Sequence, residues 1–334
     1  MKEALLYKKS EKNSVSCYLC NHHCKIAEDK FGFCGVRENS KGVLNTYAYG
    51  KVVTSQIDPI EKKPLYHFLP GSKSLSIATV GCNFRCGFCQ NWEISQGSIR
   101  ERSQEGENFL PKDIVKAALN KKCRSISYTY TEPTVFFEYA METAIIAKEK
   151  GLNNNFVTNG YMTEEALTMI HPYLDAANID LKSFRDEFYR EICKASLEPV
   201  LNSIRVMKKL NIWIELTTLI VPGENDSEDE LRDIAEFIAG VDKNIPWHIS
   251  RFHPNYNFTD REATPEATLK KAQEIGYKSG LPYVYVGNVL GFGNDTYCHQ
   301  CEKLIIKREG FTVSEYNMKE GKCAFCSAII PGVF

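Results

Sequence analysis

Three cysteines within eight positions are the first residues in this sequence whose type and spacing could do chemistry. They stand in GCNFRCGFCQ, residues 81–90, as Cys82, Cys86 and Cys89. A tetrahedral structural metal site uses four protein ligands, and so does an ordinary iron–sulfur cluster. A triplet that no fourth thiolate joins leaves one metal position open, and an open position is where a substrate or cofactor can bind.

Eight further cysteines form two groups of four near the ends of the chain. The carboxyl-terminal group pairs two C-x2-C knuckles, as Cys298, Cys301, Cys323 and Cys326. Such knuckles favour a structural zinc ion, with a single iron as the alternative. The amino-terminal group is Cys17, Cys20, Cys24 and Cys34. Zinc and an auxiliary iron–sulfur cluster both remain open there, and His22 or His23 could replace a thiolate.

The composition indicates a cytosolic globular protein. The chain has 334 residues, of which 43% are hydrophobic and 25% charged, with a net charge of −1. We find no signal peptide and no apolar run long enough to cross a membrane, and the charge disfavours nucleic-acid binding. Cytosolic thiols stay reduced, so thirteen cysteines indicate metal sites rather than disulfides. The two ungrouped cysteines, Cys123 and Cys193, are predicted to be buried inert thiols.

The elements that must position these residues alternate between short β-rich runs and longer amphipathic helices. Strands are predicted over residues 74–80, 124–130, 154–158, 177–181, 212–218, 247–252 and 283–287. Helices are predicted over residues 113–122, 134–150, 163–170 and 227–240. This alternation predicts a parallel sheet, either a barrel or a doubly wound sheet. The predicted organisation is an amino-terminal cysteine module with a lead-in (1–70), an α/β domain (71–290) and a zinc-ribbon-like module (291–334), whose hairpin is LIIKREGFTVSEY.

Polar residues follow the predicted strands at the end where parallel α/β folds bind ligands. They include Thr131-Glu132-Pro133, Thr158-Asn159-Gly160, Asp180-Leu181-Lys182 and Arg251-Phe252-His253. Strands that all deliver polar groups at the same end are typical of one shared cavity inside a barrel. We therefore predict a partial (β/α)6 barrel of the TIM type.

The C-x3-C-x2-C spacing on the loop after the first strand resembles the signature of the radical S-adenosylmethionine (SAM) superfamily. The resemblance implies that Cys82, Cys86 and Cys89 hold a [4Fe–4S] cluster whose fourth iron is chelated by SAM. It further implies that the reduced cluster cleaves SAM to methionine and a 5′-deoxyadenosyl radical, which abstracts hydrogen from a substrate. Phe88 is then the aromatic residue that packs near the adenine. Thr131 and Glu132 stand where the family has Gly-Gly-Glu, whose carboxylate contacts SAM, but Tyr130 and Thr131 replace the glycines.

VTNG (157–160), DLK (180–182), VPGEND (221–226) and FHP (252–254) resemble motifs of the pyruvate formate-lyase-activating branch of that family. The resemblance nominates Asn159, Asp180 and Lys182 as residues that hold SAM, and His253 as a residue near its ribose. For Asp180 the alternative is a plain ion pair with Lys182, and for His253 ordinary packing. Val157 replaces an aspartate of that branch, which makes a monovalent cation beside SAM doubtful.

Several longer stretches resemble one group within this branch, the radical SAM enzyme of the AmmeMemoRadiSam system. They are CYLCNHHC, GFCGVREN, DPIEKKPLYHFLPGS and CAFCSAIIPGVF, together with the triplet. The resemblance implies AMMECR1-like and Memo-like partner proteins and an electron donor such as flavodoxin or ferredoxin. It does not identify a substrate. Lys62, Lys63 and His67 could reach the mouth of the cavity, but we expect them to lie in a solvated basic loop.

The sequence thus predicts a cytoplasmic radical SAM oxidoreductase that acts on a partner protein. Two alternatives stay open within the enzyme class, namely modification of a small molecule or of RNA. A third alternative is a metal-binding scaffold without catalysis.

Overall fold

A sheet of eight strands forms the centre of the molecule. The computed structural model describes residues 1–96, 106–289, 291 and 293–334. The strands pair in the order β16-β15-β14-β13-β12-β11-β9-β8. Seven of them are parallel, namely β9 (Lys73–Ala78), β11 (Ser125–Tyr128), β12 (Asn153–Thr158), β13 (Ala176–Asp180), β14 (Trp213–Ile220), β15 (Trp247–Arg251) and β16 (Val284–Gly287). The predicted parallel α/β architecture is confirmed.

Six helices carry the chain from each parallel strand to the next, as a right-handed crossover requires. They are α3 (Pro111–Asn120), α4 (Phe137–Glu149), α5 (Glu164–Ile170), α7 (Leu197–Lys209), α8 (Glu228–Asp242) and α9 (Glu266–Lys278). The sequence patterns predict four of these helices and do not predict α7 and α9. Side chains cap the starts of two helices: the Thr163 hydroxyl accepts from the Ala166 N–H before α5, and Ser227 accepts from Glu230 before α8.

The sheet is an open barrel in the part of the chain that the structure describes, because β8 and β16 end it and pair with one neighbour each. The edge strand β8 (Thr54–Pro59) runs antiparallel to β9. Most of its residues are half-buried or exposed, so its pattern differs from that of the buried parallel strands. The predicted lead-in therefore contributes a strand to the central sheet. The predicted boundary at residue 290 lies outside the described residues.

Short elements complete the domain around the sheet. They are η1 (Ile60–Lys62), α1 (Trp92–Ser95), η2 (Pro133–Phe136), η3 (His171–Tyr173), α6 (Asp186–Phe188), the π-helical turn η4 (Tyr189–Cys193), and the strand pair β7 (Lys51–Val52) and β10 (Glu107–Asn108). Ile77 of β9, Tyr128 of β11 and Phe156 of β12 lie opposite one another in register. The loops after these three strands consequently leave the sheet at the same level and meet.

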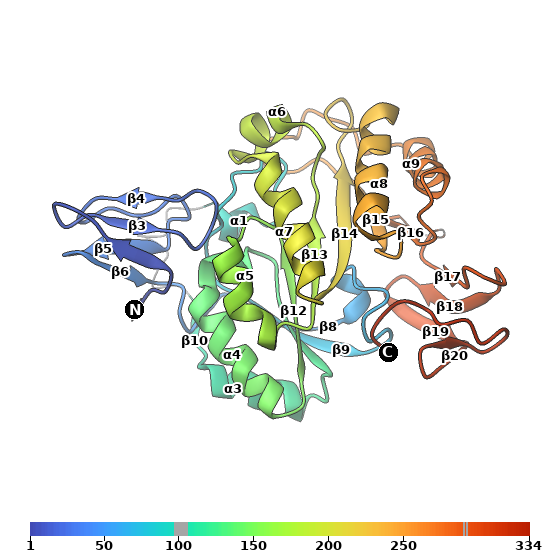
Figure 1. Cartoon of the computed structure of the whole chain (residues 1–334), viewed down its shortest axis with the longest axis horizontal. Coiled ribbons are helices and arrows are strands. Elements are labelled where there is room, and N and C mark those ends of the chain that lie inside the picture. Colours follow the sequence, from blue (N-terminus) through green and yellow to red (C-terminus); the bar gives the residue numbers. More distant parts are fainter. Residues whose placement is uncertain (97–105, 290, 292) are drawn as a thin grey trace.

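Two small β-modules lie on opposite sides of the barrel (Figure 1). The amino-terminal module has two three-stranded sheets, with orders β1-β6-β5 and β2-β3-β4. Its strands are β1 (Lys2–Glu3), β2 (Tyr7–Lys9), β3 (Val15–Cys17), β4 (Lys25–Ile26), β5 (Arg37–Ser40) and β6 (Val43–Thr46). The Asn21 N–H donates to Tyr161 O at 3.0 Å, just beyond the end of β12. This module therefore adjoins the carboxyl ends of the parallel strands.

The carboxyl-terminal module contains the predicted hairpin. Its strands are β17 (Thr296–Tyr297), β18 (Leu304–Glu309), β19 (Thr312–Tyr316), β20 (Met318–Lys319) and β21 (Lys322–Cys323). Its small apolar cluster includes Tyr283 and Tyr285, at the start of β16. The Arg308 guanidinium donates to Tyr66 O at 2.9 Å. This module therefore lies toward the amino ends of the strands. Among the described helices, none combines the length and the apolar character that a bilayer crossing needs.

Candidate active site

The cysteine triplet occupies the loop between β9 and α1. Hydrogen bonds fix this loop at two points: the Gly81 N–H donates to Ile94 O at 2.9 Å, and the Arg85 N–H donates to Cys193 O at 2.8 Å. Gly81 has a φ of +100°, a conformation that glycine adopts at the least cost. As a result, all three thiols of the triplet line one cleft at the carboxyl ends of the strands.

The protein environment disfavours free thiolates at the triplet. Burial raises the pKa of Cys82 and of Cys89, and the Ser95 hydroxyl lies 3.2 Å from Cys89 Sγ. The pKa of Cys86 is raised first by its contact with the Cys193 thiol and then by burial. Such thiols ionise when a cationic metal core takes the place of their protons. Cys193 is buried, as predicted, but it lies against a residue of the triplet.

The spacing of the three thiols fits a cluster better than a single ion. Each thiolate of a cubane binds a different iron, so its thiols stand apart, whereas the thiolates around one ion crowd together. Within the described part of the chain, only Cys298, Cys301, Cys323 and Cys326 bring three or more ligand atoms within 4.8 Å of one another. The triplet is more widely spread than that. Its donor set fits a [4Fe–4S] cluster with one iron free of protein ligands.

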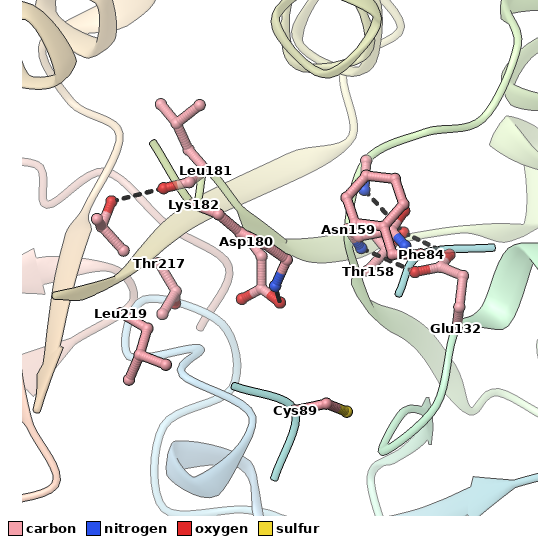
Figure 2. Close-up of polar contacts among 12 residues, drawn as sticks. Phe84, Cys89, Glu132, Thr158, Asn159, Asp180, Leu181, Lys182, Thr217 and Leu219 are labelled. Carbon is pink, nitrogen blue, oxygen red and sulfur yellow. Dashed lines mark hydrogen bonds and ion pairs between the residues drawn. The ribbon is translucent and has the colours of Figure 1, made fainter. Parts of the chain in front are cut away.

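Glu132, Thr158 and Asn159 form one corner of the cleft, where β11 and β12 end (Figure 2). Glu132 Oε1 accepts from the Thr134 N–H at 3.0 Å and from the Thr158 hydroxyl at 2.7 Å. Glu132 Oε2 accepts from the Asn159 N–H at 2.8 Å, and Asn159 Nδ2 donates to Asn83 Oδ1 at 2.7 Å. Burial raises the pKa of Glu132, although these donors oppose the shift. The corner thus fastens the loop after β12 to the triplet loop.

One of the two residues that replace the expected glycines, Tyr130, keeps a glycine-like backbone conformation. Tyr130 has a φ of +64°, in the left-handed region that non-glycine residues seldom occupy. Two side-chain bonds fix the peptides here: Asn91 Nδ2 donates to Tyr130 O at 2.8 Å, and the Thr131 hydroxyl donates to Thr79 O at 2.8 Å. The substitution of both glycines therefore leaves the backbone in the turn that brings Glu132 to the cleft.

Asp180 and Lys182 lie at the end of β13 and face the cleft (Figure 2). Lys182 Nζ lies 2.9 Å from Asp180 Oδ2 and 5.7 Å from the centre of the Phe88 ring. Burial lowers the pKa of Lys182, but Asp180 and Cys86 outweigh it, so the net shift is upward. Asp180 and Lys182 thus form an ion pair and also line the cleft. The pair holds the Lys182 cation beside the triplet.

The expectation of a solvated basic loop is wrong for Lys63 and His67. Lys63 is only 2% exposed, with Nζ 2.7 Å from Asp58 Oδ2 and 4.3 Å from the centre of the Tyr130 ring. Burial lowers the pKa of Lys63 to about 8. Lys63 and Lys62 both line the cleft. His67 is buried elsewhere, where its Nδ1 lies 2.7 Å from Pro331 O. No sequence pattern predicts the contacts with Tyr130 and Pro331, because these partners come from distant segments.

The structure does not bring His253 to the cleft. Its side chain is exposed, and the lining on that side comes from Ser250 and Asn288, with Asn288 Nδ2 donating to Ser250 Oγ at 2.9 Å. Val157 does line the cleft, so this position supplies no carboxylate. Thr217 and Leu219 of β14 form a further wall (Figure 2). The whole cleft has a volume of about 310 Å³.

The two outer cysteine groups differ in geometry. In the carboxyl-terminal module, the Cys298 and Cys326 sulfurs lie 3.6 Å apart and those of Cys301 and Cys323 lie 3.7 Å apart. The predicted convergence of four thiols on one point is confirmed there. The amino-terminal cysteines instead surround a hollow. The two candidate replacements stand outside that hollow: His22 Nε2 lies 2.6 Å from Asn83 O, and His23 is exposed.

Residues 76–238 match the model of the Radical SAM superfamily. This range contains the triplet and the carboxyl ends of β9, β11, β12, β13 and β14. An uncharacterized protein of Methanocaldococcus jannaschii is 46% identical over 330 residues, which cover 98% of each chain. The pyruvate formate-lyase-activating enzyme of Clostridium pasteurianum is 22% identical over 58% of this chain and 86% of its own.

Among solved structures, Streptococcus suis SuiB bound to S-adenosylmethionine superposes with a TM-score of 0.52. The match covers 70% of this chain and 56% of SuiB, at 14% sequence identity. At this identity the likeness concerns the fold. It agrees with the parallel α/β architecture described above.

Proposed function

This chain belongs to the radical SAM superfamily of enzymes, and from that premise we propose that it cleaves SAM reductively in order to abstract hydrogen from a partner protein. The observation that carries the proposal is the spread cysteine triplet at the floor of a cleft lined by Glu132, Asp180 and Lys182. When bound, a reduced [4Fe–4S] cluster supplies the electron that breaks SAM into methionine and a 5′-deoxyadenosyl radical.

The residues of the chain then act by holding and orienting. Cys82, Cys86 and Cys89 hold the cluster and leave one iron open. Lys182 stays protonated beside Asp180 and offers a cation to the carboxylate of SAM, while Asp180 offers an acceptor to its amino group. Phe88, buried in the cleft wall, packs against the adenine.

Glu132 acts mainly through its neighbours. Both of its oxygens accept bonds from protein donors, and it is only 2% exposed. We assign it the task of holding Asn159 in place, so that the Asn159 amide stays against the triplet loop and Thr131 stays at the cleft edge. Replacing Glu132 should therefore raise the KM for SAM without removing the cluster.

A protein substrate is favoured by the relatives of this chain. Relatives of this chain include enzymes named as glycyl-radical or pyruvate formate-lyase activators. The proposed partners are AMMECR1-like and Memo-like proteins and an electron donor such as flavodoxin or ferredoxin, in the cytoplasm.

We also propose that the carboxyl-terminal module binds zinc. Its four sulfurs stand at separations near the value of about 3.8 Å that follows from a zinc–sulfur distance of about 2.3 Å in a tetrahedron. Four thiolates close the coordination shell, so this ion is structural.

The first experiment measures 5′-deoxyadenosine. Anaerobically reconstituted protein, given dithionite and SAM, should release it, and Cys86→Ala should lower the release at least about 100-fold because the cluster loses a ligand. Cys123→Ser, at a buried thiol outside the cleft, is the matched control and should leave release unchanged. Release by Cys86→Ala, or none from intact protein that carries a full cluster, would overturn the proposal.

A second experiment identifies the class of substrate. Extract from cells grown in deuterated medium is separated by ultrafiltration into macromolecules and small molecules, and each fraction is incubated with the active enzyme and SAM. Deuterium should enter 5′-deoxyadenosine from the macromolecular fraction, and protease treatment, but not ribonuclease, should abolish the transfer. Transfer from the small-molecule fraction, or transfer that only ribonuclease removes, would refute a protein substrate.

A further inference from the structure

The four amino-terminal cysteines line a closed, largely apolar hollow between their module and the barrel. Cys17 lies on β3, Cys24 precedes β4, Cys34 precedes β5, and Cys20 forms a β-bridge with Met162. The remaining walls come from Leu19, Ile26, Gly32, Arg37, Thr134 and Val135. The hollow has a volume of about 20 Å³. All four thiols thus border one small space.

The spacing around this hollow separates a single ion from a cluster. The carboxyl-terminal thiols converge within 4.8 Å of one another, as the ligands of one ion must. Among the described residues, no three of the amino-terminal thiols do so, and in this they match the catalytic triplet. Thiolates that bind the four corners of a cubane stand apart because each binds a different iron. This chain therefore contains both arrangements, the convergent thiols and the spread thiols, so the two can be compared within one protein.

The chemistry of the lining fits an anionic metal–thiolate group. The ligand set is four soft thiolates, which suit iron–sulfur clusters as well as zinc. Arg37 is 1% exposed, its Nη1 lies 3.8 Å from Cys17 Sγ, and its buried Nε has no hydrogen-bond partner. The guanidinium also pairs with Glu138, so it offsets only part of the negative charge of four thiolates around a metal core. Charge does not distinguish zinc from a cluster, but the spread of the thiols does.

We propose that Cys17, Cys20, Cys24 and Cys34 bind an auxiliary [4Fe–4S] cluster. The site is separate from the catalytic triplet, but neighbouring residues contact the triplet loop. His22 Nε2 contacts Asn83 O of the triplet loop at 2.6 Å, and Arg85 of that loop donates to Phe33 O. Thr134, which lines the hollow, donates to the Glu132 carboxylate at the edge of the cleft. The auxiliary cluster therefore adjoins the catalytic face, while the zinc module lies away from it.

The test removes the catalytic cluster and asks what metal remains. A full-length Cys82→Ala/Cys86→Ala/Cys89→Ala variant is reconstituted anaerobically with iron, sulfide and zinc. It should retain about four irons and four sulfides per chain and about one zinc. Its Mössbauer spectrum should be that of a [4Fe–4S]²⁺ cluster. About two zinc ions without iron, or one zinc and no other metal, would overturn the proposal.

A reciprocal variant guards against misfolding and keeps this inference separate from SAM cleavage. Cys20→Ser/Cys34→Ser in the otherwise intact chain should halve the iron content from about eight to about four. The remaining cluster should still show a SAM-dependent change in its electron paramagnetic resonance spectrum. Cys123→Ser should keep all of the iron, and circular dichroism should match among the variants. An unchanged iron content in Cys20→Ser/Cys34→Ser would refute the auxiliary site alone, whereas a cluster that SAM never perturbs would refute the proposed function.

Discussion

The amino-terminal and carboxyl-terminal modules contain the same number of clustered cysteines, and each is attached to the barrel through a buried arginine. Arg37 pairs with Glu138 of α4, and Arg308 lies 3.7 Å from Glu61 of η1. The two modules lie on opposite sides of the barrel (Figure 1). Yet one set of thiols surrounds a hollow beside the catalytic loop, while the other closes on a point. The number of thiols thus does not decide the metal. The distances between the thiols and the position of the group on the barrel differ between the two modules.

The largest expected effect is the loss of the carboxyl-terminal ion. Cys298→Ser/Cys326→Ser removes two ligands of a module whose own apolar cluster is small. A structural zinc site contributes on the order of 10 kcal/mol to folding, so β18 and β19 should unfold locally. Hydrogen exchange should become fast in these strands while β12 and β13 stay protected. Iron content should not change. Protected β18 amides in the metal-free variant would show that packing alone holds this module.

The second effect compares the two arginines. Arg37 and Glu138 are both 1% exposed and lie 2.5 Å apart, so Arg37→Met leaves an uncompensated buried carboxylate and should cost about 3–5 kcal/mol of unfolding free energy. Arg308 instead donates to the backbone oxygens of Tyr66 and Asn294.

A pair of double-mutant cycles, measured by chemical denaturation, tests this difference. Arg37→Met with Glu138→Met should give a coupling of about 3 kcal/mol, whereas Arg308→Met with Glu61→Met should give about 1 kcal/mol or less. Equal couplings would mean that both modules are attached by the same kind of ion pair.

The third effect is a pH dependence confined to the carboxyl-terminal interface. Burial lowers the pKa of His67 to about 4, below its usual value of about 6.5. Between these values the unfolded chain binds the proton and the folded chain does not. The stabilisation is therefore complete above about pH 6.5 and is lost as the pH falls toward 4, by up to roughly 3 kcal/mol.

Denaturation of the intact chain and of His67→Gln across this range measures the effect. The stability difference between the two should shrink on acidification, because the variant lacks the titrating ring. His67 contacts Tyr285 Oη at 2.6 Å and Pro331 O, both at this interface. A constant difference across the range would exclude His67 as the titrating group.

Much of the fold follows from local pattern. Short runs rich in β-branched and aromatic residues, such as those of β11 and β14, predict strands, and the intervening amphipathic segments predict crossover helices. Local pattern does not predict the edge strand β8, because its side chains are largely polar and it joins the sheet through backbone hydrogen bonds. The triplet and the polar residues at strand ends are also visible in the sequence, since parallel strands collect their carboxyl ends on one face.

Other parts of the site depend on residues far apart in the chain. Lys63 pairs with Asp58 of its own segment, but the ring over which it lies belongs to the distant Tyr130. Cys193 lies against Cys86 because η4 folds back on the triplet loop. His253 follows a strand whose neighbours do line the cleft, but its own side chain is exposed. No local pattern encodes these outcomes.

Residue identity and short-range periodicity are enough to predict the ligand types, the three cysteine groups, the parallel strands and four of the six crossover helices. They do not tell which four thiols converge and which four stand apart, because that depends on how two small sheets and the barrel wall pack around Cys17, Cys20, Cys24 and Cys34. Two groups of four thiols in one chain therefore differ in geometry for reasons that lie in the packing of distant segments.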